Sequence, residues 1–236
     1  GKCFTTGLFL SPASVQTELQ SEASNSMATQ LIEKGAYIQW KNEEAADGLV
    51  IRFSIPDGVN GGGTKGVIAL YVDDRFISNI TLDSYWAWQH AFMTGQTYPD
   101  NLPAVNKFAR MRFDDLRVKL DRKIPGGATF KLVKVDNNKI PYTIDFVELE
   151  PVPPPVTYET ISDQNKVCYH LSDGPLDQFI AHNGGKTIYI PAGKYDVYER
   201  IYIHKPNTKI IGAGMWHTEI YFASPSDKVE TSPKRG

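Results

Sequence analysis

The sequence predicts an all-β chain: an antiparallel, jelly-roll-like β-sandwich followed by the N-terminal cap and first coils of a right-handed parallel β-helix. Short apolar or alternating runs separated by turn residues fill positions 20–150, as in β-sandwiches. The proline run Pro151-Val-Pro-Pro-Pro155 then fixes φ and makes a stiff, extended spacer. Beyond it, very short strands rich in β-branched and aromatic residues each end at Gly or Pro, which is the pattern of a β-helix.

Composition places the chain among ordinary globular proteins. Its 236 residues are 41% hydrophobic and 22% charged, with a formal net charge of -2. The pI of about 6.2 and the lack of a basic patch predict no nucleic-acid partner. No apolar stretch approaches the ~18 residues of a membrane span, so no membrane partner is expected either. We expect a monomer.

Four segments follow from these patterns. They are an N-terminal extension (1–19), the sandwich (20–150), a proline-rich linker (151–157) and the start of the β-helix (158–236). The chain opens on Gly1 without an initiator Met or a signal peptide, and a solenoid needs more coils than the last segment can supply. We therefore expect a piece of a longer protein.

The expected sandwich strands are apolar or alternating runs bounded by Gly, Pro, Asp and Asn clusters. They cover Gly35–Trp40, Gly48–Ile55, Gly66–Val72, Arg75–Leu82, Arg117–Leu120, Thr129–Val135 and Tyr142–Leu149. Helical spacing is nearly absent. Around Asn106–Leu116, the side chains of Phe108, Met111 and Leu116 either line one short helical turn or cover the edge of the sandwich.

The second half begins with a short helix over Pro175–Asn183, which Gly184-Gly185 ends. Five short strands then follow, each bent by Gly or Pro before the next. They are Thr187–Pro191, Tyr195–Tyr198, Arg200–Ile203, Thr208–Ile211 and Thr218–Phe222. They supply only one or two coils of a solenoid.

No catalytic constellation is predicted. The adjacent carboxylates Asp73-Asp74 and Asp114-Asp115 point to opposite faces if they lie on strands, so turn or edge roles are favoured over an acid/base pair. The five histidines are scattered and show no metal-ligand spacing.

Three oxygen ligands are candidates for a metal site in the sandwich. Gln20 and Glu22 are two apart where the first strand is expected to begin, so they project on one face, and Asp145 opens the last strand. If the first and last strands pair, these oxygens converge on a hard cation such as Ca²⁺. The alternative is a polar pair that is hydrogen-bonded or faces solvent near the domain seam.

A cluster of aromatic residues is the candidate sugar-binding surface. Tyr85, Trp86 and Trp88, with Tyr98 in the following loop, lie in an irregular stretch between strands. Exposed aromatic faces on loops suit the apolar C–H faces of sugar rings. The alternative is that one of the two tryptophans packs in the core. Trp40 is in register with Ile38 on its strand and is expected in the core.

The order of these motifs resembles the N-terminal part of bacterial mycodextranases and α-1,3-glucanases. There, a sandwich similar to family 35 carbohydrate-binding modules precedes a pectin-lyase-like β-helix. The resemblance rests on Gly35-Ala-Tyr-Ile-Gln-Trp40, Val50-Ile-Arg-Phe-Ser-Ile-Pro-Asp57, Leu82-Asp-Ser-Tyr-Trp86, Arg112-Phe-Asp-Asp-Leu-Arg117, Tyr142-Thr-Ile-Asp-Phe-Val-Glu148 and Ile188-Tyr-Ile-Pro-Ala-Gly-Lys-Tyr195.

The resemblance implies a secreted glycoside hydrolase that cleaves α-glucan containing α-1,3 linkages, with catalytic aspartates beyond Gly236. It also implies a structural calcium site that fits Glu22 and Asp145, with Gln20 where related modules often carry a carboxylate. Two other classes stay open. One is a non-catalytic carbohydrate-binding or adhesive protein, and the other is a different β-helix enzyme, such as a polysaccharide lyase or a fructotransferase.

Overall fold

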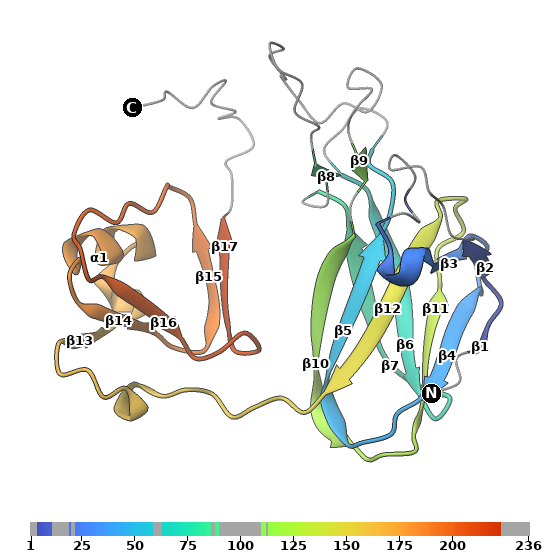
Figure 1. The fold of residues 1–236 in the computed structure, drawn as a ribbon, viewed down its shortest axis with the longest axis horizontal. Coiled ribbons are helices and arrows are strands. Elements are labelled where there is room, and N and C mark those ends of the chain that lie inside the picture. The colour runs from blue at the N-terminus through green and yellow to red at the C-terminus, as the bar shows by residue number, and fades with distance from the viewer. Residues whose placement is uncertain are drawn as a thin grey trace, which may run out of the picture. The chain divides into compact units, whose positions relative to one another are not determined.

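The computed structural model describes residues 4–10, 19, 22–58, 63–85, 88–89, 110–111 and 113–222. The chain divides into two compact units, Gly1–Val152 and Pro153–Gly236, which we call the two-sheet unit and the parallel-strand unit (Figure 1). The regular secondary structure of the described residues is mostly β-strand, with one short α-helix and three 3-10 turns. They include no helix that is long and apolar enough to cross a membrane.

Two five-stranded antiparallel sheets build the two-sheet unit (Figure 1). The first sheet has the order β1-β4-β11-β6-β7, with bounds Phe4–Thr5, Tyr37–Lys41, Thr129–Lys134, Lys65–Val72 and Arg75–Asp83. The second has the order β10-β5-β12-β3-β2, with bounds Asp114–Ile124, Ala46–Ser54, Tyr142–Glu150, Ala28–Leu31 and Leu8–Leu10. A separate pair joins β8 (Trp88–Gln89) to β9 (Arg110–Met111).

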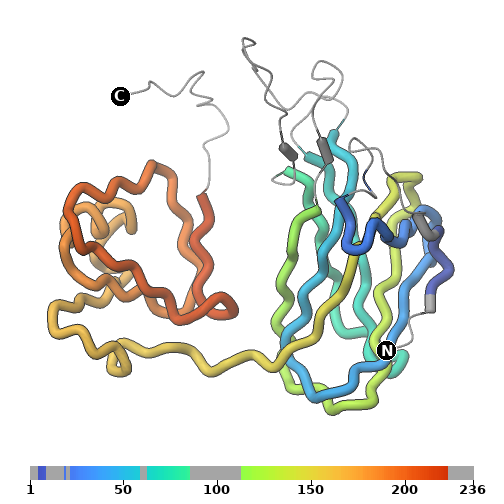
Figure 2. The backbone as a smooth tube through the Cα atoms, in the orientation of Figure 1, coloured from blue at the N-terminus to red at the C-terminus, as the bar shows by residue number. Residues whose placement is uncertain are grey.

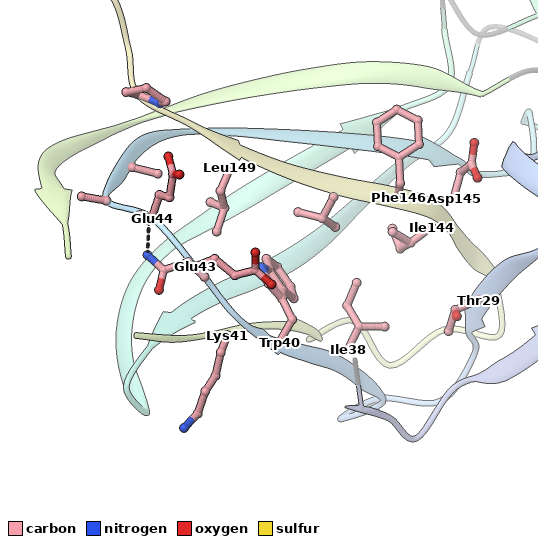
Figure 3. Close-up of a pocket in the computed structure, with 15 residues that line it drawn as sticks. Thr29, Ile38, Trp40, Lys41, Glu43, Glu44, Ile144, Asp145, Phe146 and Leu149 are labelled. Atoms are coloured by element: carbon pink, nitrogen blue, oxygen red, sulfur yellow. Dashed lines mark hydrogen bonds between the residues drawn. The ribbon is translucent and has the colours of Figure 1, made fainter. Parts of the chain in front are cut away.

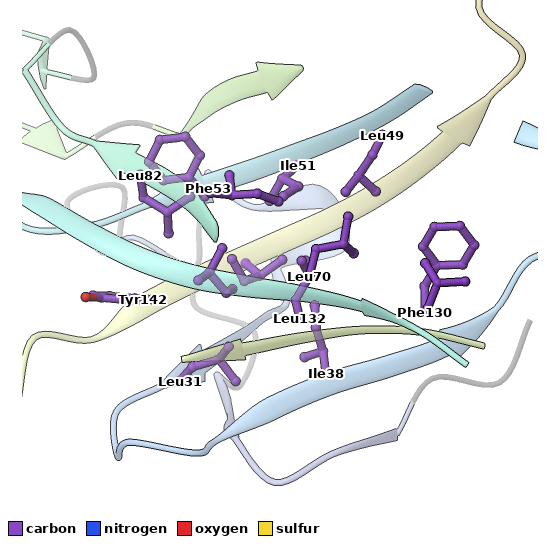
Figure 4. Close-up of a cluster of buried hydrophobic side chains, with 14 of the residues drawn as sticks. Leu31, Ile38, Leu49, Ile51, Phe53, Leu70, Leu82, Phe130, Leu132 and Tyr142 are labelled. Atoms are coloured by element: carbon purple, nitrogen blue, oxygen red, sulfur yellow. The ribbon is translucent and has the colours of Figure 1, made fainter. Parts of the chain in front are cut away.

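The hydrophobic core of this unit lies between the two sheets, and both contribute side chains to it (Figure 4). Leu70 and Leu132 come from the first sheet, and Leu49 and Ile51 from the second; all four are fully buried. Because side chains alternate along a strand, one face of each sheet is apolar and turns inward. Burying each such side chain contributes roughly 1.5–3 kcal/mol before the entropy of ordering is subtracted.

Most predicted strands of this unit are confirmed within a few residues. β1 and β2 lie within the expected N-terminal extension, and the strand expected to begin at Gln20 and Glu22 begins only at Ala28, as β3. Of the two alternatives for 106–116, the helical turn is wrong for the described residues there, and the placement of Leu116 agrees with the alternative that these side chains cover the sheet edge. Leu116 lies in β10, which pairs with β5, and it packs against the core. Met111 lies in β9, while Phe108 falls outside the described residues.

A β-bulge changes which side chains of β12 face the core. Ile144 pairs with Phe53 and Phe146 pairs with Arg52, which leaves Asp145 as the extra residue. The inward positions therefore move from even to odd numbers, and Val147 is among the side chains that pack against the core. Bulges re-aim side chains in this way because they insert one residue into a period of two.

A buried lysine fastens the loop that leads into β12. The amine of Lys134 is fully buried and donates to the carbonyl oxygens of Ile32, Asn138 and Ile140, at 2.5, 2.9 and 2.6 Å. It also lies 4.4 Å from the centre of the Tyr142 ring. Burial lowers the pKa of Lys134, and the nearby Asp136 carboxylate partly opposes this shift.

The hydroxyl of Tyr142 extends the same polar network. It donates to Oδ2 of Asp136, an oxygen that also accepts the Val67 N–H at 2.6 Å. Burial raises the pKa of Tyr142 to about 12, and the hydrogen bond to Asp136 adds to this effect. The network joins β6, β12 and the loop between β11 and β12.

The parallel-strand unit stacks short strands side by side. β13 (Lys166–Cys168), β14 (Thr187–Ile190) and β16 (Lys209–Gly212) form one parallel sheet, and β15 (Gly193–Val197) pairs in parallel with β17 (Thr218–Phe222). The short helix α1 (Leu176–His182) lies between β13 and β14 in the sequence. Figure 2 traces how the chain passes from β14 to β15 and returns through β16 to β17.

Ile188 and Ile190 lie at the centre of the core of this unit, with Leu176 and Ile180 of α1 packed in the same cluster. The strand expected over Arg200–Ile203 is wrong. These residues form no strand, and the Tyr202 and Ile203 side chains are more than half exposed. No described strand lies beside them to complete a hydrogen-bond ladder, although the composition favours a strand.

The proline-rich segment docks on the parallel-strand unit instead of standing free as a spacer. The Val156 N–H donates to the Ala213 carbonyl at 2.9 Å, and the Tyr189 hydroxyl donates to the Val156 carbonyl at 2.7 Å. Nε2 of His217 donates to the Pro153 carbonyl at 2.8 Å. The chain is therefore fixed to this unit from Pro153 onward.

Candidate functional site

A pocket of about 570 Å³ opens between β4 and β12 at one side of the two-sheet unit (Figure 3). Its volume lies within the ~300–1,000 Å³ range of small-molecule sites. Its walls come from both strands and from the turn that follows β4. The lining residues are Thr29, Ile38, Trp40, Lys41, Asn42, Glu43, Glu44, Ala45, Ala46, Ile144, Asp145, Phe146, Val147, Leu149 and Pro151.

The pocket exists because the neighbouring strands are short. β1 pairs with β4 only at Gln39 and Ile38, and β3 pairs with β12 only from Tyr142 to Ile144. Trp40 and Lys41 of β4 and the stretch 145–150 of β12 pair with no strand on that side among the described residues. Within this part of the chain, no strand closes the edge between the two sheets there.

Trp40 forms the aromatic part of the wall. Its ring stacks on Phe130, with ring centres 5.8 Å apart and planes at 20°, and it packs against the core from a half-buried position. The core placement expected for Trp40 is therefore confirmed, and its remaining surface lines the pocket. Figure 3 shows both Trp40 and Glu43 among the lining side chains.

Asn42 shapes the turn at the mouth. Its side-chain N–H groups donate to the Glu44 and Pro125 carbonyls, both at 2.9 Å. Its Oδ1 is buried and accepts no hydrogen bond from any described residue. The residue as a whole is 6% exposed. A buried acceptor without a donor carries a desolvation cost, which the two hydrogen bonds of the amide N–H groups help to offset.

The predicted sugar-binding aromatics fall only partly within the described residues. Tyr85 is exposed, and its N–H donates to the Asp83 carboxylate at 2.9 Å. The backbone of Trp88 pairs with Met111 in the β8–β9 ladder. Trp86 and Tyr98 lie outside the described residues. Sugar binding by these four residues stays a prediction.

The residues predicted to bind calcium are arranged differently from the sequence expectation. Glu22 lies in a turn, because the strand that follows it, β3, begins only at Ala28. Gln20 lies outside the described residues. No group of three or more His, Cys, Asp or Glu side chains able to hold a metal occurs in the described part of the chain.

Asp145 is already occupied by other partners. Its buried carboxylate accepts from Nε of Arg52 at 2.8 Å and from the Ser24 N–H at 2.8 Å. The Arg52 guanidinium lies 3.7 Å from Asp115 and within 6 Å of the Phe113 and Phe146 ring centres. Calcium binding by Gln20, Glu22 and Asp145 stays a prediction.

The two aspartate pairs hold no acid/base site. Asp73 and Asp74 have positive φ values of 50° and 60° in the turn between β6 and β7, as hairpin turns require. Asp73 accepts the Thr129 N–H at 2.8 Å, which supports the expected turn role. Burial raises the pKa of Asp114, whose carboxylate accepts the Asp115 N–H at 2.8 Å.

Comparison with known proteins assigns the family. A family model described as the α-1,3-glucanase catalytic domain D1 matches residues 1–152, and one described as D2 of the same catalytic domain matches residues 167–232. The chain therefore belongs to the α-1,3-glucanase catalytic domain family. No curated protein sequence matches the chain closely enough to be counted as a relative.

The fold of the chain is similar to parts of two solved catalytic domains. The catalytic domain of Agl-KA shares 27% identity over 95% of this chain, with a TM-score of 0.75. A GH87 α-1,3-glucanase catalytic domain in complex with nigerose shares 25% over 92% of this chain, with a TM-score of 0.73. The chain spans only 41% and 39% of these two domains.

The same fold occurs in the catalytic unit of the thermostable GH87 α-1,3-glucanase from Streptomyces thermodiastaticus strain HF3-3. The identity is 21% over 93% of this chain and 39% of that one, with a TM-score of 0.67.

Proposed function

We propose that the chain is the opening part of a secreted glycoside hydrolase that cleaves α-1,3-linked or mixed α-1,3/α-1,4-linked glucan. The observation that carries this proposal is the order of the two family matches. The D1 match ends at residue 152, where the two-sheet unit also ends, and the D2 match lies wholly within the parallel-strand unit. Related catalytic domains of this kind have been solved with nigerose and with tetrasaccharides.

In this proposal the two-sheet unit is a β-sandwich, and the parallel-strand unit is the opening of a right-handed β-helix. The parallel ladders β14–β16 and β15–β17 support it, because each step along the chain adds a strand beside the previous one. Adjacent strands lie roughly 4.8 Å apart. Stacking therefore brings side chains from residues far apart in sequence to within a few ångströms of one another.

This spacing suits glycoside hydrolysis. The reaction needs two carboxyl groups, about 5–5.5 Å apart for retention or about 6.5–9.5 Å for inversion of the anomeric centre. Carboxylates one or two coils apart, with backbones roughly 5–10 Å from one another, can reach these separations. The chain spans only 41% and 39% of two related catalytic domains, which supports placing the catalytic aspartates in coils that follow residue 236.

We assign the sandwich the role of an accessory unit that binds carbohydrate or braces the first coil. Tyr85, Trp86, Trp88 and Tyr98 are the sugar contacts in the first case. The exposed position of Tyr85, at the end of β7, supports their availability to a polysaccharide.

The test compares the 236-residue chain with the full product of the parent reading frame. Both are incubated with insoluble α-1,3-glucan and with mixed α-1,3/α-1,4-glucan, and released reducing ends are measured. Activity of the long form alone is expected. If neither form hydrolyses glucan and the short form still binds it, the protein is a carbohydrate-binding protein and the hydrolase proposal fails. Unsaturated products or a difructose anhydride would instead identify a lyase or a fructotransferase.

A further inference from the structure

We infer that the pocket between β4 and β12 is a binding site for one or two hexopyranose units of an α-1,3-glucan chain. The sugar class rests on the proposed function, and the site itself rests on the geometry of the pocket. Tyr85 of the predicted aromatic cluster is not among the residues that line this pocket.

The apolar wall is held rigid before any ligand arrives. Trp40 is stacked on the buried Phe130, and Ile144 lies in the same core cluster. Val147 and Leu149 face the same space because the bulge at Asp145 turns them inward. A fixed aromatic ring next to aliphatic side chains suits the C–H face of a pyranose, and rigidity lowers the entropic cost of binding.

The polar groups at the mouth select hydroxyls. Both N–H groups of the Asn42 amide are held by the Glu44 and Pro125 carbonyls, which fixes the amide orientation and leaves Oδ1 as a buried acceptor without a donor. This enclosed oxygen cannot be reached from the pocket, and the fixed amide instead holds the turn that carries Glu43 and Glu44. The lining residues Glu43 and Glu44 supply acceptors for hydroxyls.

The charge of the pocket favours a neutral sugar over an acidic one. Glu43, Glu44 and Asp145 outnumber Lys41 among the lining residues, and Asp145 is neutralised by Arg52 outside the lining. The carboxylates of the lining would repel the negative charge of a uronate or phosphate, whereas a neutral glucan would not be repelled.

The free edge of β12 adds backbone groups. From 146 to 150 the strand pairs with β5 on one side and with no described strand on the other. Backbone N–H and C=O groups on such an edge need partners, and hydroxyls can serve as both donors and acceptors. An apolar wall, the carboxylates of Glu43 and Glu44 and a strand edge unpaired among the described residues therefore converge on one pocket.

The experiment measures binding of α-1,3-linked gluco-oligosaccharides, nigerose and longer, to the 236-residue chain by isothermal titration calorimetry. Ala45→Trp fills the pocket from its partly exposed turn without removing any packed side chain. It is expected to weaken the Kd at least tenfold. Ala181→Trp, the same substitution on the exposed surface of α1, is the matched control and should leave the Kd unchanged.

A second variant, Glu43→Gln, keeps the size of the side chain and covers the case in which Ala45→Trp fails to fold. It is expected to weaken binding several-fold while thermal unfolding is unchanged. Tyr85→Ala separates the pocket from the aromatic cluster, because it should leave pocket binding intact.

Wild-type affinity in both pocket variants would overturn the proposal, and so would loss of binding in Tyr85→Ala alone. No binding by the 236-residue chain, together with hydrolysis by the long form, would reject the pocket and leave the proposed function standing. Binding that the pocket variants weaken, without hydrolysis by the long form, would support the pocket and reject the proposed function.

Discussion

Replacing Asp145 by Ala tests whether this residue stabilises the two-sheet unit as an ion-pair partner or as a metal ligand. The Asp145 side chain is 0% exposed and accepts from Arg52 Nε and the Ser24 N–H, each at 2.8 Å, and from the Ser24 hydroxyl at 3.2 Å. The substitution removes all three hydrogen bonds and leaves the Arg52 guanidinium without its closest carboxylate. The loss should therefore not depend on calcium.

The magnitude follows from the surroundings of Arg52. Breaking a buried ion pair by removing one partner costs about 3–5 kcal/mol, because a charge is left uncompensated. Here the Arg52 side chain is 32% exposed and retains Asp115 at 3.7 Å, so water and a second carboxylate offset part of the loss. We expect the lower end, about 3 kcal/mol. For a unit of this size, that lowers Tm by about 6–12 °C.

The assay is differential scanning calorimetry of wild type and variant, in excess calcium and in excess EGTA. Asp145→Asn keeps one acceptor oxygen but no charge and should lose about half as much. Asp74→Ala is the control, since it removes the exposed partner of Lys131 at 2.7 Å, a surface pair worth at most about 1 kcal/mol. Destabilisation by Asp145→Ala in calcium but not in EGTA would refute the ion-pair reasoning and make Asp145 a metal ligand.

Two further predictions concern the polar network at β12. The pKa of Tyr142 is about 12 in the folded state, against 10 in the unfolded chain. The protonated hydroxyl therefore contributes about 2–3 kcal/mol to the free energy of unfolding, which is present below pH 10 and lost as pH rises toward about 12. Urea unfolding should show a lower free energy of unfolding at about pH 11 than at about pH 9 in wild type, and a smaller drop in Tyr142→Phe. Equal drops in the two proteins would contradict the role of Tyr142. Lys134→Met leaves three carbonyls without their donor and should lower the free energy of unfolding by about 2 kcal/mol. The control Lys131→Met removes an exposed ion pair and should change it by less than about 1 kcal/mol. Equal effects of the two substitutions in urea unfolding would disprove the role of Lys134.

Much of the fold could be predicted because strands and helices depend on patterns of apolar residues within a short stretch of sequence. The continuous apolar run in 66–72 and the near-alternating pattern in 129–135 correspond to β6 and β11, and the proline run marks the passage between the two units. The apolar i, i+3, i+4 spacing near Leu176 likewise predicts α1. These patterns depend on residues adjacent in the chain, so a single sequence suffices to read them.

The candidate site was predicted only in part. Trp40 was expected in the core, and it does pack there, but nothing in the run around it shows that its remaining surface borders a pocket. Asn42 lies in a turn with no sequence motif for binding. Its orphan Oδ1 depends on the distant Pro125 carbonyl, which holds the amide in place.

By itself, the sequence determined the all-β class, the break between two units and the resemblance to α-1,3-glucanases, because these depend on composition, periodicity and motif order. Tertiary structure alone decided the pairing of Asp145 with Arg52, the bulge that turns Val147 inward and the opening between β4 and β12. The physical reason is that each of these features joins residues about a hundred positions apart. Their contact depends on strand register and on where β1 and β3 end, which no local pattern encodes.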